Sequence, residues 1–142
     1  MAIGAAEHHR PVVVDDRRPE QPAPLSSAEQ RLWFFDQLQP RHPFYNMPVA
    51  ARLCGPLDEN ALRQSLQELV QRHESLRTTF PSNFGRPVRR IAPRGELALR
   101  CVDLRGVPAE RREQELQRQL RAEAREPFDL ARGPLLRCVL YR

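Results

Sequence analysis

The chain has 142 residues, which suffices for one domain with a buried core but not for two well-packed ones. Hydrophobic residues make up 40% of it and the mean hydropathy is −0.63, as in soluble globular proteins. No apolar run approaches the roughly 18 residues that span a bilayer, so we predict no membrane partner. Residues 1–16 lack the apolar centre of a secretory signal, which favours a cytoplasmic location.

The charge raises the question of nucleic-acid binding. All 23 basic residues are arginine and the formal net charge is +5. The densest arginine stretch, residues 111–125, is interleaved with glutamates, a pattern typical of a solvated helix face. We therefore predict no nucleic-acid partner. The alternative predicts an affinity that falls steeply with salt.

The cysteines give no sign of metal or redox chemistry. Cys54, Cys101 and Cys138 stand far apart and form no Cys-x-x-Cys pair. We predict reduced, partly buried thiols and no metal site.

Local signals divide the chain into a leader and one domain. Residues 1–24 are rich in proline and charge and show no periodicity, so we predict a disordered leader or linker there and a domain over 25–142. Ser26 and Glu29 match a capping box, which predicts a helix that ends before Pro40.

Two further helices and five strands are expected. Asp58 is suited to cap a helix over 60–74, whose apolar residues share one face, and Pro108 is suited to the first turn of a helix that ends near residue 125. Strands are predicted at 49–54, 76–80, 86–91, 97–102 and 135–141. The last is apolar at nearly every position, which indicates a strand buried on both faces in the middle of a sheet. This order predicts an α+β fold with helices packed on a mainly antiparallel sheet.

Two segments carry a family resemblance. The chain reads S-S-A-E-Q-R-L-W-F over residues 26–34 and R-H-E-S-L-R-T-T-F over residues 72–80. These resemble the first two core motifs of the condensation domains of nonribosomal peptide synthetases, S-x-A-Q-x-R-L-W and R-H-E-x-L-R-T-x-F. Supporting similarity lies in order at residues 45–48, 55–58 and 127–137. Glu29 stands where the family usually has Gln, and either side chain can complete a capping box.

The resemblance implies a fold and a reaction. Residues 25–142 would form the N-terminal lobe of a two-lobed, chloramphenicol acetyltransferase-like fold with a tunnel between the lobes. Peptidyl or acyl carrier proteins would bring a donor and an aminoacyl acceptor into the tunnel. Each would be tethered to phosphopantetheine, with no cofactor bound by the domain itself. The second His of the family motif H-H-x-x-x-D-G would act as general base or positioning group while the amide forms.

That histidine motif is absent from this sequence. The resemblance places it shortly after Tyr141, in a C-terminal lobe that would be a missing partner. The pair His8-His9 cannot replace it, because Val13 and Val14 stand where Asp and Gly are needed. A general base must lie within about 3 Å of the amine that it assists. We therefore expect no catalytic residue here and no condensation activity by the chain alone.

The motif residues are predicted to be structural. An arginine of the second motif, Arg72 or Arg77, could pair with the Asp of the absent motif, or could face the C-terminal dipole of its helix, and an architectural role is favoured. A His on a helix beside a core stripe, and Trp33 and Phe34 at helical spacing, are also expected to be structural. The set comprises Ser26, Gln30, Arg31, Trp33, Arg72, His73, Glu74 and Arg77.

A second hypothesis belongs to another functional class. The same half-fold could be a non-catalytic interaction module that docks a carrier protein or a separate C-terminal half. Stoichiometric binding of such a partner would distinguish it.

Overall fold

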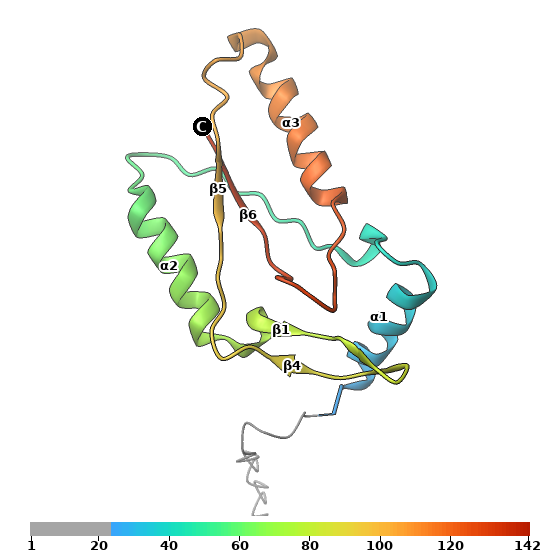
Figure 1. Cartoon of the computed structure of the whole chain (residues 1–142). Coiled ribbons are helices and arrows are strands. Elements are labelled where there is room, and N and C mark those ends of the chain that lie inside the picture. The colour runs from blue at the N-terminus through green and yellow to red at the C-terminus, as the bar shows by residue number, and fades with distance from the viewer. Residues whose placement is uncertain (1–23) are drawn as a thin grey trace, which may run out of the picture.

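The computed structural model describes residues 24–142, so the predicted leader lies outside the described residues except for Pro24. In Figure 1, β5 and β6 run through the middle of the molecule, with α2 on one side, α1 and α3 on the other, and β1 and β4 below. The helices are α1 (Ser27–Leu38), α2 (Glu59–Arg72) and α3 (Ala109–Arg125), with 3-10 turns η1 (Pro43–Tyr45) and η2 (Glu74–Arg77). The strands are β1 (Thr78–Thr79), β2 (Ser82–Asn83), β3 (Arg86–Pro87), β4 (Arg90–Ile91), β5 (Leu99–Val102) and β6 (Cys138–Tyr141).

The three predicted helices are confirmed, and local capping explains where two of them begin. The Ser26 hydroxyl accepts a hydrogen bond from the Glu29 amide at 3.3 Å, and the Glu29 carboxylate accepts one from the Ser26 amide at 2.7 Å. Asp58 Oδ1 accepts from the amides of Asn60 and Ala61 at 2.9 and 3.0 Å. Each cap satisfies amides that have no partner inside the helix.

The strands form three two-stranded sheets within residues 24–142. The pairs β1–β4 and β2–β3 are antiparallel, and β5–β6 is parallel, with Leu99 opposite Cys138 and Val102 opposite Tyr141. Helices and small sheets together confirm the predicted α+β class.

The predicted strand at 49–54 is wrong, because the structure has no strand there. Side chains fix this part of the chain along α3 instead. Asn46 Nδ2 donates to the carbonyls of Ala124 and Glu126 at 2.9 and 2.8 Å, and the Arg52 guanidinium lies 3.7 Å from the Glu113 carboxylate. The residues suit a strand, but among residues 24–142 no strand pairs with them.

The other predicted strands are shorter than expected. Residues 76–77 lie in η2, and the predicted strand at 86–91 is divided between β3 and β4, which pair with different strands. β6 has β5 as its one hydrogen-bonded neighbour in the described chain, and its four residues are only half-buried. The prediction of a central strand buried on both faces is therefore wrong for the described residues.

The core is small for a chain of this size. The buried hydrophobic residues are Leu25, Trp33, Val70, Leu97 and Leu104, and no described side chain is less than 2% exposed. Protein interiors normally pack to a much higher degree of burial, so much apolar surface remains open here. None of the helices in the described part of the chain is long and apolar enough to cross a membrane.

Candidate functional site: the junction of the motifs and an apolar groove

The first motif forms the N-terminal turns of α1. Gln30 Nε2 donates to the Leu25 carbonyl at 3.0 Å, and Glu29 pairs with Arg89 from the turn before β4. Burial raises the pKa of Glu29, but hydrogen bonds from the Ser26 amide and hydroxyl and from the Arg89 guanidinium outweigh it, so the pKa lies below its usual value. Arg31 is exposed.

Phe80 joins the segments that carry the family resemblance. Trp33, which is buried, donates from Nε1 to the Phe80 carbonyl at 3.2 Å. The Phe80 amide donates to the Leu130 carbonyl at 2.7 Å. The first motif, the second motif and the segment 127–137 therefore meet at one residue, although they are far apart in the sequence.

The second motif crosses from α2 into β1. The Arg77 side chain is 13% exposed; its guanidinium donates to the Ala92 carbonyl and lies 3.5 Å from the Glu74 carboxylate. The Arg77 Nε is buried and has no hydrogen-bond partner among the described residues. Arg72 and His73 are exposed at the C-terminal end of α2, so the structure does not bring them into the junction.

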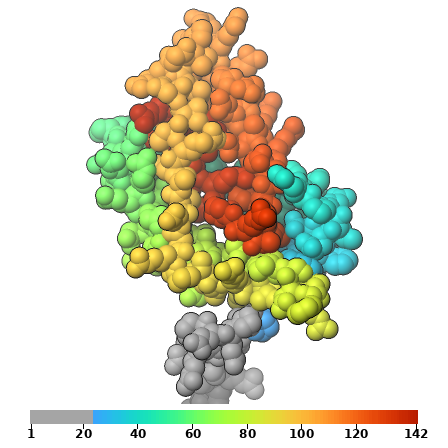
Figure 2. Space-filling model, in the orientation of Figure 1, coloured from blue at the N-terminus to red at the C-terminus, as the bar shows by residue number. Residues whose placement is uncertain are grey.

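A large open cavity lies beside this junction. Its volume is about 1010 Å³, and we call it the apolar groove. Figure 2 shows the red β6 segment set back between β5 and the orange α3. The groove is lined by apolar side chains from α1, from the segment after it and from β6, which include Leu32, Phe35, Phe44, Met47, Val139 and Tyr141. Of the predicted site residues, Trp33 also lines it, whereas Arg77 lines a smaller cavity of about 240 Å³.

Sequence patterns alone do not reveal this groove. Phe34, which helical spacing places in the core, is 56% exposed, and Phe35 is 48% exposed. Phe44 and Met47 are 74% and 90% exposed and lie outside any periodic segment, so no helical or strand pattern could assign them to a face. Apolar residues between two prolines, in a segment with no regular structure, were the one available signal.

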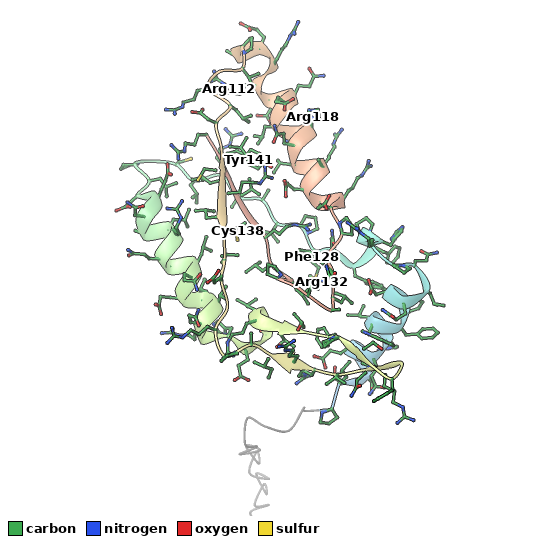
Figure 3. All side chains as sticks on the ribbon, viewed as in Figure 1. Arg112, Arg118, Phe128, Arg132, Cys138 and Tyr141 are labelled. Atoms are coloured by element: carbon green, nitrogen blue, oxygen red, sulfur yellow. The ribbon has the colours of Figure 1, made fainter. Side chains whose placement is uncertain are left out.

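Polar groups are few in the groove. Burial raises the pKa of Asp36, the negative charge of Asp129 raises it further, and a hydrogen bond from Gln37 opposes both. The Tyr141 hydroxyl is buried and has no hydrogen-bond partner in the described chain. Figure 3 shows Tyr141 and Cys138 along β6, with Phe128 in the segment that follows α3. The Arg137 guanidinium stacks 4.0 Å from the centre of the Phe128 ring.

One histidine lines the groove, but it is engaged in capping. His42 Nδ1 accepts a hydrogen bond from the Phe44 amide at 3.2 Å, at the start of η1. No salt bridge joins it to a carboxylate within residues 24–142. The arrangement therefore lacks the orienting acid that usually accompanies a catalytic base.

The thiols differ partly from expectation. All three are free, but Cys54 and Cys101 are exposed, so partial burial holds only for Cys138. Burial raises the pKa of the Cys138 thiol. No group of three or more His, Cys, Asp or Glu side chains in the described residues could hold a metal ion.

Comparison with known proteins assigns the family. The sequence model of the condensation domain matches residues 19–142. The chain belongs to the condensation-domain family. A segment of one linear gramicidin synthase protein from Brevibacillus parabrevis is 54% identical over 119 residues, which is 84% of this chain and 2% of that protein. Phosphinothricin tripeptide synthetase PhsC of Streptomyces viridochromogenes is 44% identical over 89% of this chain and 12% of its own length.

A solved condensation domain confirms the fold. The first condensation domain of the calcium-dependent antibiotic synthetase, solved with a substrate analogue, matches with a TM-score of 0.74 and 31% identity. The match covers 85% of this chain and 29% of that one. The chain therefore corresponds to a minor part of a condensation domain with a chloramphenicol acetyltransferase-like fold, as the motifs predicted.

Proposed function

We propose that this chain is the N-terminal part of a condensation domain which, when complete, joins a carrier-bound acyl or peptidyl donor to an aminoacyl acceptor. The family match over residues 19–142 carries this proposal. The TM-score of 0.74 with a solved condensation domain supports it. The same proposal places the protein in the cytoplasm with peptidyl or acyl carrier proteins as partners.

In the proposed reaction the acceptor amine attacks the carbonyl carbon of the donor thioester. A carbon–nitrogen bond forms, the carbon–sulfur bond breaks, and the amine proton passes to the phosphopantetheine thiol that leaves. The phosphopantetheine belongs to the carrier proteins as a tether. This chain contains no H-H-x-x-x-D-G sequence, so we propose that the base comes from other polypeptide.

The motif residues are proposed to have a structural role. Ser26 and Gln30 bond to the backbone at the start of α1, and Trp33 bonds to the backbone of the second motif. The Arg77 guanidinium bonds to the Ala92 carbonyl. These contacts support positioning of the chain rather than contact with a substrate. Arg31, Arg72, His73 and Glu74 are assigned to the same class from the family resemblance.

The test is an amide-forming assay with donor and acceptor carrier proteins loaded as thioesters. The isolated chain is expected to give no amide. A single-chain fusion is expected to give amide when it joins this chain to the remaining part of the condensation domain from the similar linear gramicidin synthase. Turnover by the isolated chain would show that the base lies within it. An inactive but folded fusion would contradict the proposed reaction.

A second candidate is a non-catalytic module that docks a partner protein. The exposed apolar groove favours it, because contiguous apolar surface of this kind marks interaction sites. The two candidates separate in the fusion experiment, since a docking module would bind the remaining part without any gain of amide formation.

A further inference from the structure

The apolar groove has walls but no cover. Phe44, Met47 and Val49 are 74%, 90% and 92% exposed, and Leu38 on the opposite wall is 61% exposed. Soluble proteins rarely leave so many large apolar side chains open in one concave surface unless something binds there.

The floor of the groove is one face of β6. Val139 and Tyr141 are two residues apart, so their side chains lie on the same face of the strand, and both line the groove. β6 and β5 form a parallel pair, and parallel sheets in proteins normally have both faces covered by helices. The Tyr141 hydroxyl, buried but without a partner in the described chain, indicates that the covering element supplies a polar group there.

We propose that the groove binds an amphipathic helix from the part of a condensation domain that this chain does not match. The solved relative supplies the reason for this choice, because the match covers only 29% of its chain. A helix laid on a sheet face between flanking helices is also the standard packing of α+β domains, and helices bind apolar grooves in the same manner. The inference rests on the proposed function, since it takes the partner from the same family.

A small apolar molecule fits the groove less well than a polypeptide. The volume of about 1010 Å³ reaches the upper end of the roughly 300–1,000 Å³ that is usual for ligand pockets. Such pockets enclose most of the ligand surface, whereas Met47 and Val49 are almost fully exposed at this one.

The experiment co-expresses the tagged chain with the remaining part of the condensation domain from the similar linear gramicidin synthase, and measures complex formation by size exclusion and affinity. Phe35→Asp and Met47→Asp place a charge in the groove and are expected to weaken the complex at least about tenfold. Phe34→Asp is the matched control, because Phe34 neighbours Phe35, is 56% exposed and does not line the groove. Its complex is expected to stay within about twofold of the wild type.

Two further measurements exclude trivial explanations. Circular dichroism of each uncomplexed variant shows whether it folds, and Met47→Asp is the safer variant because Met47 is 90% exposed. Hydrogen exchange on the wild-type complex is expected to show new protection over residues 32–38 and 44–50. Equal binding by all three variants, or protection confined to α2, would overturn the proposal.

Other outcomes also count against it. These are no binding by the wild-type chain, a dimer of this chain through the groove, and protection of the groove by a fatty acid without any polypeptide. Amide formation by the single-chain fusion keeps the two proposals apart. If the fusion is active and Phe35→Asp and Met47→Asp leave it as stable and active as the wild type, the groove proposal fails and the proposed function holds.

Discussion

Gly95→Ala should destabilise the chain, because there is no room for a methyl group at this position. A Cβ placed at Gly95 would lie 2.5 Å from Val70 Cγ1 and 3.1 Å from Arg77 Cβ. Val70 is 3% exposed and lies on α2, where a β-branched side chain has one strongly preferred rotamer and cannot easily move aside. The Gly95 carbonyl also accepts hydrogen bonds from Gln67 and Gln71, each at 2.6 Å, and a shift of the turn would strain both.

The expected magnitude combines two opposing effects. Overpacking of this kind costs about 1–3 kcal/mol. The loss of backbone freedom in the unfolded chain returns about 0.4–1 kcal/mol. We expect a net loss of about 1–2 kcal/mol in the free energy of unfolding, which lowers the urea midpoint by roughly 0.5–1 M. The measurement is urea denaturation followed by circular dichroism.

Gly106→Ala is the matched control. No atom lies within 4 Å of a Cβ built there, so only the unfolded-state effect remains. Its midpoint should equal or exceed that of the wild type. If Gly95→Ala behaved like Gly106→Ala, the turn before β5 would not contact α2 as closely as the structure places it.

Two further predictions concern charged side chains. The pKa of Glu29 lies below its usual value of 4.5, so its ionised form stabilises the fold above that pH, and the stabilisation is lost as the pH falls through the folded pKa. Glu29→Gln should therefore lower the urea midpoint near pH 7 but not near about pH 3, and an equal difference at both would contradict this. Arg137→Met removes donors to the carbonyls of Pro127 and Glu123, at 3.1 and 3.3 Å. It should cost about 1–3 kcal/mol and speed hydrogen exchange in the last turn of α3, and unchanged exchange would refute it.

The sequence predicted best what neighbouring residues decide. Ser26 with Glu29, and Asp58 with the amides that follow it, are local arrangements within one turn of backbone, so α1 and α2 could be placed almost to the residue. The two motifs predicted the family for a similar reason, because each is a continuous string of residues. Their meeting at Phe80, by contrast, depends on the fold and could not be predicted from either string.

The sequence predicted strand pairing and exposure poorly, because both depend on distant segments. Residues 49–54 have strand-forming side chains, but Asn46 and Arg52 attach this part of the chain to α3. β6 has the composition of a central strand, yet it pairs only with β5 among the described residues. Composition reports what a segment would bury if a neighbour were available. The mismatch between β6's apolar composition and its half-burial is therefore what exposes the groove.

Long-range hydrogen bonds to backbone carbonyls compensate for the thin core. Trp33 bonds to the Phe80 carbonyl, Arg77 to that of Ala92, Asn46 to that of Ala124 and Gln67 to that of Gly95. A side chain that bonds to a carbonyl fixes a loop without requiring a second matched side chain, so the described segments can keep their relative positions with few buried residues. This explains how motif residues far from any reacting atom can matter to a condensation domain. They hold α1, β1 and the segment before β6 around the groove, and a partner that fills the groove would then complete a frame that already exists.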